Sequence, residues 1–538
     1  MRLSKWSDHY RNYQFTNQKP QRNLLFLNWQ LQPVTSTQMC GRAGCFGPAM
    51  NLSVRAHYQE IGKLGFMTKS VLSRQLNLPE TLAMSVALMA PSTGMVFVTS
   101  FLAAAAGYAV PLAFAASLAG VLIIGFSFGR LSKLYSHAGS AYGLCKDVLG
   151  QTAAAFAGWG LTLTYVLLSA ALLAGTGEFA QLAIKQVTGI NLPWGILAVV
   201  TSLIVFGFAM NNIRLSMRTM LILEGVSMLL IALVSALIIG HSHLSAKTAF
   251  KPFTLGKHGV IGIAQAMVFG LTSFLGFEGS AVLGEESNNP KKMVPLSIIV
   301  AALVGGIFFM FVSYAQTVGF GLTPHDVNNF AIAATPLNTL TQQYLGNTFT
   351  AMVNIGATIS FFSCALASVN GSARMLFALS RDGYAAKKLS ELHDESSTPR
   401  TAVYFVSALA LALLGLGTVW FQTPSNVLGD LSGMGTFGAL VAYGLVIIAS
   451  LVAYWRNDLQ THKWFLLALP VVGLAIIGYI VYGSVYPAPP APVSYFPYIV
   501  LGYFAIVMTY SLTLRKRHIS LRDQITGSVS AESPTGIR

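Results

Sequence analysis

A carboxylate stands between two glycines inside a long apolar run, at Gly276, Glu278 and Gly279. Hydrocarbon offers a backbone no hydrogen-bond partners, so an interrupted segment is tolerated at membrane depth only where protein or a solvated cavity surrounds it. The main-chain groups freed at such an interruption can bind a small charged solute. The run from Thr272 to Pro295 therefore predicts a binding site built from backbone dipoles, followed by a charged loop.

A second interruption lies in an earlier apolar run, at Ala90, Pro91, Ser92, Thr93 and Gly94. Proline removes a backbone donor and clashes with the preceding turn, whereas glycine permits a close approach or an unusual backbone angle. The stretch is either an unwinding point or a simple proline kink, which is common in membrane helices. This stretch is significant for a binding site only if it lies near the other interruption in the folded protein.

The composition places both interruptions in a polytopic membrane protein. Of 538 residues, 54% are hydrophobic and only 9% are charged, and the mean hydropathy is +0.60, far outside the range of soluble domains. Each span needs about 20 mostly apolar residues to cross the hydrocarbon. We predict an all-α membrane protein with twelve transmembrane helices, near 81–106, 109–132, 153–184, 193–210, 217–240, 259–284, 294–321, 347–379, 401–420, 427–454, 464–485 and 495–514.

The basic residues fall in every second connection between these spans. They are Arg130, Lys133, Lys146, Arg214, Arg218, Lys291, Lys292, Arg381, Lys387, Lys388, Arg400, Arg456, Lys463, Arg515, Lys516 and Arg517, with Lys185, Lys247, Lys251 and Lys257 as exceptions. By the positive-inside rule both termini are cytoplasmic, in the plasma (inner) membrane. The net charge of +15 thus reflects topology, and we expect lipid around the chain and no nucleic acid partner.

The chain divides by composition into four parts. Residues 1–78 are polar and basic and are expected to be a disordered cytoplasmic extension, or, for residues 1–66, an over-extended start with Met50 or Met67 as the true first residue. Residues 79–455 form the core of ten spans, 456–514 hold spans eleven and twelve, and 515–538 are a cytoplasmic tail. The four cysteines are scattered, so we expect no structural disulfides.

The two interruptions are five spans apart, and the first span starts inside whereas the sixth starts outside. That is the arrangement of two five-helix halves of inverted topology, whose discontinuous helices meet near the midplane. A half-helix N-terminus suits a carboxylate, and the carbonyls of a half-helix C-terminus suit an ammonium group. Such a pair of ends fits an amino acid.

Three motifs carry a family resemblance. The run FLGFEGSAVLGEESNNPKKMVP, the loop YSHAGSAY from Tyr135 to Tyr142, and the stretch from Arg374 to Gly383 with Thr398 and Pro399 lie along the chain in the family's order. Together with Gly158 and Trp159 they resemble the amino acid, polyamine and organocation (APC) permeases over about residues 77–455.

The resemblance implies a five-plus-five inverted repeat with discontinuous helices 1 and 6, two extra C-terminal helices, and transport by alternating access. It places the substrate carboxylate at the backbone of Ser92, Thr93 and Gly94, and the ammonium at the carbonyls of Phe274, Leu275 and Gly276. Glu278 matches the family's acidic position after the sixth-helix break. Tyr165 and Phe277, with Phe274, are the aromatics expected near the cavity, unless they are lipid-facing or packing residues.

Three carboxylates lie within the predicted spans, Glu178, Glu224 and Glu278. A charge at the bilayer centre costs on the order of 3 kcal/mol, so each is expected to face the protein interior and to serve proton coupling or gating. Glu178 lies toward the outer surface, where the alternative is a simple place in the vestibule. Glu224 lies in the cytoplasmic half of span five, where a buried carboxyl can stay protonated.

A sodium site is the minor alternative for coupling. Ser360, Ser363 and Ser368 in span eight carry hydroxyls that suit such a site, although serines in membrane helices more often bond backbone. At the cytoplasmic surface, the loop carrying Glu285 and Glu286 with Lys291 and Lys292 can form an inner gate by pairing with Arg130 or Arg381.

We therefore expect a secondary transporter that imports an amino acid, coupled to protons, with uptake of a polyamine or another organic amine as the alternative. An enzyme is not expected, because the later histidines lie outside the spans and no GxxxxGK[ST] loop occurs. We expect no cofactor and no metal. A receptor-like sensor on the same scaffold stays open, and the sequence carries no signal for an oligomeric state.

Overall fold

The computed structural model describes residues 74–135, 141–211, 213–242, 248–256, 258–392, 398–456, 464–486 and 491–531, with side-chain surroundings as far as residue 515. The chain divides into two compact units, Met1–Thr68 and Lys69–Arg538. The first unit, with nearly all of the extension predicted for residues 1–78, lies outside the described residues. The fold is therefore that of the second unit.

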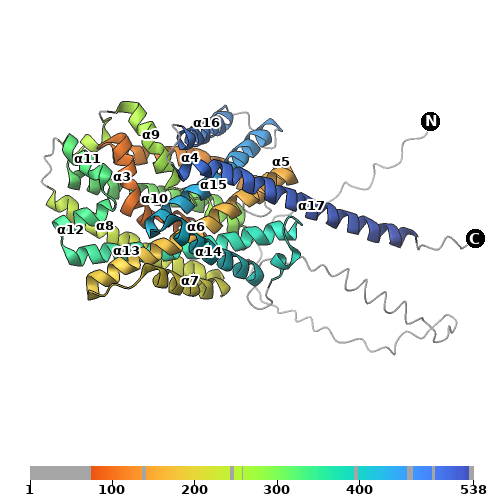
Figure 1. Cartoon of the computed structure of the whole chain (residues 1–538). Coiled ribbons are helices and arrows are strands. Elements are labelled where there is room, and N and C mark those ends of the chain that lie inside the picture. Colours follow the sequence, from red (N-terminus) through yellow and green to blue (C-terminus); the bar gives the residue numbers. More distant parts are fainter. Residues whose placement is uncertain are drawn as a thin grey trace, which may run out of the picture. The chain divides into compact units, whose positions relative to one another are not determined.

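The described residues are helical and contain no named strand, only an isolated parallel bridge between Leu76 and Ser287. The elements (Figure 1) are α2 (Leu78–Met89), α3 (Pro91–Ala106), α4 (Val110–Leu134), α5 (Ala141–Leu149), α6 (Gln151–Thr188), α7 (Trp194–Met210), α8 (Ile213–His241), η1 (Lys251–Phe253), α9 (Gly259–Thr272), η2 (Gly279–Leu283), α10 (Pro290–Phe320), α11 (Pro324–Ile332), α12 (Pro336–Tyr344), α13 (Asn347–Arg381), η3 (Lys387–Ser390), α14 (Arg400–Phe421), α15 (Pro424–Trp455), α16 (Phe465–Val485), η4 (Val493–Tyr495) and α17 (Phe496–Ala531).

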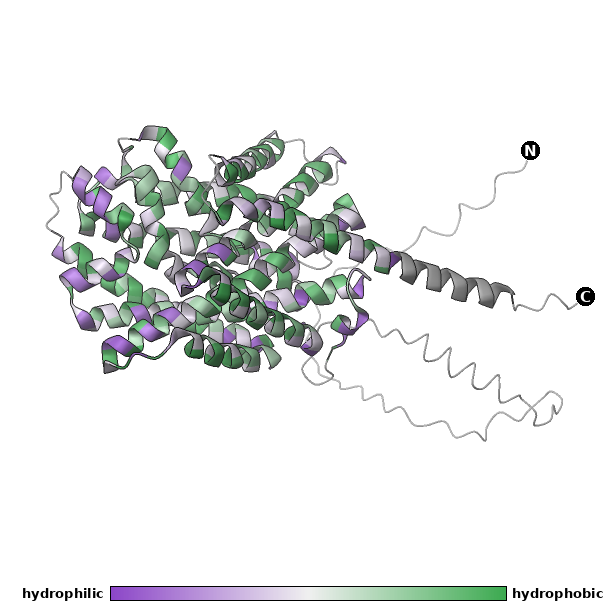
Figure 2. Cartoon of the chain, viewed as in Figure 1, coloured by the Kyte–Doolittle hydropathy of each residue, from purple (hydrophilic) through white to green (hydrophobic). Residues whose placement is uncertain are grey.

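Ten helical segments of the described chain are long and apolar enough to cross a membrane, and α2 with α3 counts as one of them. Two shorter apolar helices, α7 and α9, lie where the fourth and sixth spans were predicted. Figure 2 shows hydrophobic residues along the lengths of the long helices and hydrophilic residues gathered mainly in short helices and connections. The predicted all-α membrane class is confirmed. The last helix also continues to Ala531, beyond the predicted end of span twelve at 514.

Proline opens many of these helices. Helices α3, α10, α11, α12 and α15 begin at Pro91, Pro290, Pro324, Pro336 and Pro424. Proline suits this position because its missing N–H would have no helical partner there and its φ is already helical. Prolines in the sequence therefore mark the positions where these helices begin.

Helix α6 lies at the centre of the bundle, packed against α13 and α15 along much of its length. The contact with α15 depends on paired glycines, because a Cβ on Gly160 would lie 2.6 Å from the Gly438 carbonyl oxygen. Small residues allow this close approach of helix backbones, which contributes packing energy where lipid supplies no hydrophobic drive. The arrangement fixes α6 as the rigid wall on which one side of the candidate site is built.

Candidate functional site

The first interruption is a single residue. Helix α2 ends at Met89, Ala90 adopts a left-handed conformation with φ of 43°, and α3 begins at Pro91. The Ala90 N–H donates to the Val86 carbonyl, and its own carbonyl accepts from the Thr93 N–H at 3.1 Å and the Thr93 hydroxyl at 2.8 Å. A non-glycine residue in this region costs about 1–2 kcal/mol, so the surrounding packing holds it.

The second interruption is longer. Helix α9 ends at Thr272, turns continue to Glu278, and η2 begins at Gly279, with Gly276 at a φ of 93°. Within these turns the Phe274 carbonyl accepts from the Phe277 N–H, and the Gly276 carbonyl accepts from the Gly279 N–H.

The Leu275 carbonyl accepts no hydrogen bond from any described residue outside the helices. The other two carbonyls predicted at this break, those of Phe274 and Gly276, each accept a backbone N–H.

The two interruptions are in direct contact. A Cβ on Gly276 would lie 2.6 Å from the Leu88 Cβ and 2.8 Å from the Leu88 carbonyl carbon. One turn later, the Ser280 N–H donates to the Ser85 hydroxyl at 2.8 Å. On the α3 side, a Cβ on Gly94 would lie 4.0 Å from the Ser273 Cβ. The predicted substrate-binding residues of both breaks are therefore neighbours in space.

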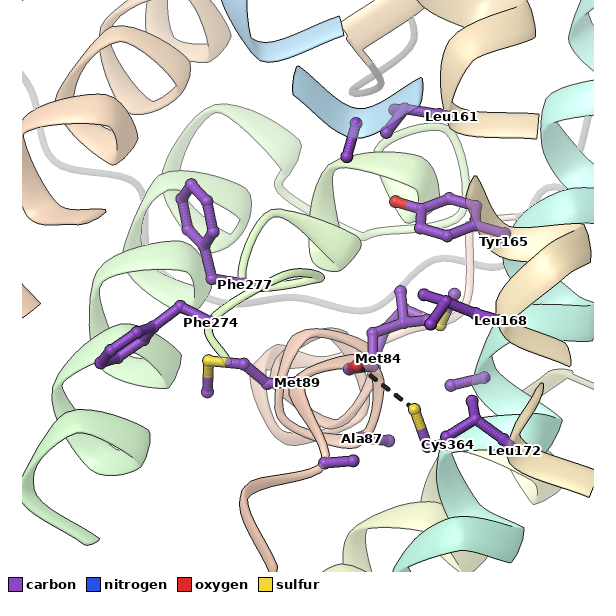
Figure 3. Packing of buried hydrophobic residues seen from close by; sticks show 14 of the residues in the cluster. Met84, Ala87, Met89, Leu161, Tyr165, Leu168, Leu172, Phe274, Phe277 and Cys364 are labelled. Carbon is purple, nitrogen blue, oxygen red and sulfur yellow. Dashed lines mark hydrogen bonds between the residues drawn. The ribbon is translucent and has the colours of Figure 1, made fainter. Parts of the chain in front are cut away.

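Glu278 is held between two tyrosines. Its side chain is 1% exposed, and its Oε1 accepts from the Tyr165 hydroxyl of α6 at 2.9 Å. Its Oε2 accepts from the Tyr443 hydroxyl of α15, which also accepts from the Gly276 N–H at 3.4 Å. Helices α6 and α15 thus meet the second interruption at one carboxylate. Figure 3 shows Tyr165 on the opposite side of α2 from Phe274.

Tyr443 was not among the predicted site residues. A tyrosine in an apolar span is normally interpreted as a packing residue, and its partner lies 165 positions earlier in the chain. The ring of Phe277 packs edge-on against both Tyr443 and Phe128, at centroid distances of 5.6 and 6.0 Å. Phe274 packs instead edge-on against Phe309 at 4.9 Å.

Phe274 and Phe277 line an apolar pocket with Leu275, and Thr272 lies on the same wall. Its other described lining residues come from α4, α9, α15 and α16: Val121, Ile124, Leu271, Thr436, Leu440, Tyr443 and Ile480. This described lining carries no Asp, Glu, Lys or Arg. The pocket therefore adjoins the second interruption and offers no charged partner among its described lining residues.

Glu224 lies on α8, close to the first turn of α3. It is 1% exposed, its Oε1 accepts from the Ser360 hydroxyl of α13 at 2.9 Å, and its Oε2 has no partner among the described residues. Ser92, the second residue of α3, lies beside it, and the Ser92 Oγ is likewise without a described partner. The thiol of Cys364 donates to the Leu88 carbonyl at 3.3 Å, as drawn in Figure 3.

Glu178 stands apart from these groups. It is partly exposed and accepts from the Ser425 hydroxyl at the start of α15 at 2.5 Å. It lies thirteen residues beyond Tyr165 on the same helix, which is about 20 Å at 1.5 Å per residue. The structure therefore does not bring Glu178 together with Glu278, and the position fits the vestibule alternative.

The serines considered for sodium are divided among different partners. Ser360 bonds Glu224, Ser363 donates to the Met220 carbonyl at 3.3 Å, and Ser368 Oγ has no described partner. Among the described residues no group of three or more His, Cys, Asp or Glu is placed to hold a metal ion.

Ion pairs gather in the connections that carry the basic residues. Arg381 donates to both oxygens of Glu285 at 2.7 and 2.8 Å, and buried Arg374 donates to both oxygens of Glu286 at 2.6 and 3.1 Å. The Arg381 partner was predicted. The alternative partner Arg130 was wrong, because its guanidinium donates to the Leu466 carbonyl at 2.8 Å instead.

The segment before α2 is tied to the same loop. The N–H groups of Gln75 and Leu76 both donate to the Glu286 carbonyl, at 2.9 and 3.0 Å, and the Asn288 N–H donates back to the Leu76 carbonyl. The Glu80 carboxylate of α2 then pairs with Arg214 and Arg218, at 3.2 and 3.1 Å. One face of the bundle is thus closed by a continuous set of charged and main-chain contacts.

Comparison with known proteins gives one family and several relatives. The family model described as "Amino acid permease" matches residues 81–517. Relatives include a branched-chain amino acid permease (BcaP) of Bacillus subtilis strain 168, 27% identical over 410 residues, covering 72% of this chain and 82% of the relative. A low-affinity putrescine importer (PlaP) of Escherichia coli K12 is 24% identical, covering 69% and 79%, and a methylthioribose transporter of Bacillus subtilis is 24% identical, covering 72% and 82%.

Proposed function

The chain belongs to the amino acid permease family, and on that premise we propose that it imports an amino acid by alternating access. The family model describes amino acid permeases, and the relatives are named as transporters of branched-chain amino acids, putrescine and methylthioribose, so the chain is a multi-pass membrane transporter and not an enzyme. The resemblance to the APC permeases is confirmed by the same match.

One observation carries the proposal, the contact between the two interruptions. The first turn of α3 begins at this contact, with its positive dipole end and the N–H of Ser92, and the unbonded carbonyl of Leu275 lies in the opposing turns. A carboxylate is stabilised at the first and an ammonium at the second. Breaks of this kind at midplane depth are where inverted-repeat carriers bind their substrates.

The architecture of the proposal is the five-plus-five inverted repeat with twelve spans and both termini cytoplasmic. Its support is the position of the interruptions, in the first span and in the sixth, with α7 and α9 counted as shorter spans. We propose that the hydrogen bonds of Glu278 change when substrate binds. Its two tyrosine partners lie on α6 and α15, whereas its own segment contacts α2. A shift of the break would separate the carboxylate from one phenol.

The cytoplasmic side of the proposal is a closed inner gate. The Arg381–Glu285 and Arg374–Glu286 pairs join α13 to the loop after η2, and the segment before α2 bonds the same loop. The partly exposed pair contributes only about 0–1 kcal/mol, whereas breaking the buried Arg374 pair costs several kcal/mol. Arg374 is therefore the residue that we propose holds this gate closed.

Proton coupling is proposed to use the buried carboxylates. Glu224 and Glu278 are both 1% exposed, and they accept hydrogen bonds from different helices, from Ser360 of α13 and from Tyr443 of α15. Glu178 is kept as a candidate for attracting protons or substrate at the outer mouth, where it bonds Ser425. Buried carboxylates in a membrane mark proton paths because their charge is costly there.

Uptake of an amine is the second candidate function. The putrescine importer of Escherichia coli is nearly as similar to this chain as the branched-chain permease is. A diamine needs a second anionic subsite. Both oxygens of Glu278 are engaged by phenols, whereas Glu224 Oε2 has no described partner and is the carboxylate oxygen left for such a subsite. The described lining of the pocket beside Leu275 carries no charged residue, which supports a neutral substrate side chain.

Reconstitution into proteoliposomes tests the proposal. We expect labelled L-leucine to accumulate when an inward proton gradient is imposed, to be competed by unlabelled leucine more strongly than by putrescine, and to leak out on adding a protonophore. Gly276→Leu should abolish uptake, whereas Gly415→Leu, at a helical glycine with open space around it, should retain it. Putrescine as the better competitor would instead support uptake of an amine, and uptake of no proteinogenic amino acid and no di- or polyamine would refute both.

A further inference from the structure

The C-terminal end of α13 is closed by its own backbone. The helix ends at Arg381, and Gly383 follows at a φ of 84°. The Gly383 N–H donates to the Ser380 carbonyl at 3.0 Å, and the Tyr384 N–H donates to the Leu379 carbonyl at 2.8 Å. These two bonds form a Schellman motif, which satisfies the last carbonyls of a helix. Tyr384 is therefore held in a fixed position relative to the turn that carries Arg381.

The last helix, α17, holds Tyr384 through two side chains. The Ser511 hydroxyl donates to the Tyr384 carbonyl at 2.8 Å and accepts from the Trp159 indole N–H at 2.9 Å. Arg515, one turn further along α17, donates to the Tyr384 hydroxyl at 2.6 Å, and its guanidinium carbon lies 5.3 Å from the centroid of the Tyr384 ring. The same guanidinium donates to Gln151 at the start of α6. Because Tyr384 is 1% exposed, these contacts replace water around its polar groups.

The residues before Tyr384 contact two further parts of the chain. Asp382 accepts from the Lys146 ammonium of α5 at 2.6 Å and from the Tyr142 hydroxyl of the same helix. Arg381 donates to both oxygens of Glu285, in the loop after η2, at 2.7 and 2.8 Å. One short segment thus joins α5, α17 and this loop to the end of α13.

The Arg381–Glu285 pair depends on alignment. A guanidinium and a carboxylate form two parallel hydrogen bonds only when both groups are correctly oriented. The pair is partly exposed, so it contributes little unless its side chains are already held in place. We propose that Arg515 is a positioning residue of the inner gate, which aligns Arg381 for Glu285 by holding Tyr384. This inference rests on the proposed function and deepens its inner gate.

The consequence is a change in the balance between the two orientations of the carrier. Without the Arg515 contact, the inner gate opens more readily and the fraction of carriers that face outward falls. The apparent KM for outside substrate rises as the binding-competent fraction falls, so a fraction of roughly a third to a tenth raises KM about three- to tenfold. A merely structural role would instead remove folded carriers, which lowers Vmax and leaves KM unchanged.

Uptake of labelled L-leucine by intact bacterial cells that express the full-length chain gives KM and Vmax. The amount of carrier is measured by immunoblotting of membranes. We expect Arg515→Gln to raise KM about three- to tenfold. Tyr384→Phe loses the hydroxyl that accepts from Arg515 and should raise KM as well. Lys388→Gln removes the same charge at an exposed position of η3 and should keep the wild-type KM.

A double variant tests the route of the effect. Glu285→Gln alone should raise KM, because the gate loses this ion pair. Arg515→Gln should add little in that background, since Arg515 acts through the same pair. A KM ratio for the double variant equal to the product of the two single ratios would show independent action and overturn the inference.

The remaining outcomes separate the inference from the function beneath it. Leucine uptake with a wild-type KM in both Arg515→Gln and Tyr384→Phe overturns the inference and leaves the carrier standing. Uptake of no proteinogenic amino acid by the wild-type chain overturns the proposed function, and the inference with it. If Arg515→Gln does not reach the membrane, Tyr384→Phe, alone and combined with Glu285→Gln, decides.

Discussion

Replacing Gly276 with alanine tests the contact on which the candidate site depends. The new Cβ would lie 2.6 Å from the Leu88 Cβ and 2.9 Å from the Leu88 carbonyl oxygen, whereas ordinary contacts begin near 3.4 Å. The two breaks would have to separate by about 0.8 Å, the difference of 3.4 and 2.6 Å. Non-glycine residues at positive φ cost about 1–2 kcal/mol and overpacking costs about 1–3 kcal/mol.

We therefore expect Gly276→Ala to lose about 2–5 kcal/mol of stability and to transport poorly, because a misplacement near 1 Å at a binding site can cost on the order of a hundredfold. The assays are thermal unfolding in detergent and leucine uptake in proteoliposomes. Gly415→Ala is the control, since a Cβ there meets nothing within 4 Å. Wild-type unfolding temperature and uptake in Gly276→Ala would refute the reasoning.

Three further changes each act on a single contact or a single buried group. Tyr443→Phe should destabilise by about 1.5–3 kcal/mol in thermal unfolding, because the carboxylate of Glu278 loses a hydrogen bond to a buried charge. Arg374→Ala should cost about 3–5 kcal/mol because it leaves Glu286 buried and unpaired. Burial raises the pKa of the Cys145 thiol to about 12, so little thiolate exists at about pH 8 and maleimide should label it slowly in folded protein.

Each has a matched comparison. Tyr482→Phe alters a tyrosine that is 57% exposed and should leave the unfolding temperature unchanged; equal losses in both tyrosine variants would argue against the role of Glu278. Arg218→Ala removes a 58% exposed side chain and should cost less than about 1 kcal/mol. For Cys145, peptide mass spectrometry before and after unfolding in SDS gives the two rates, and fast labelling of the folded protein would contradict the burial.

The sequence predicts the interruptions well because their signals are local. Proline and glycine act on their own turn, so the end of α2 and the unwound stretch at Gly276 can be located from neighbouring residues alone. The apolar runs can be predicted for a similar reason, since each depends on a window of about 20 residues. The described chain has ten helical segments that are long enough to cross a membrane, and two shorter apolar helices.

The partners of the buried charges, in contrast, cannot be predicted from neighbouring residues. Basic residues can be assigned to one side of the membrane from their spacing, but the choice between Arg130 and Arg381 for Glu285 depends on which helix ends meet. Tyr443 and Arg374 could not be singled out because each acquires its role through a residue far away in the chain. The separation of Glu178 from Tyr165, the partner of Glu278, follows from their spacing along α6, whereas a role in coupling or a place in the vestibule stays a prediction.

The junction at Ala90 has a mechanical consequence. Its N–H completes the last turn of α2 while its carbonyl completes the first turn of α3, so each helix keeps its own end bonded. Two torsion angles of one residue then set the angle between the helices, and a swing of one against the other requires no bond of either to open. Rotation about the Ala90 torsion angles is resisted by the side chains packed around this residue. A bound solute would change the relative orientation of α2 and α3 by acting on those side chains.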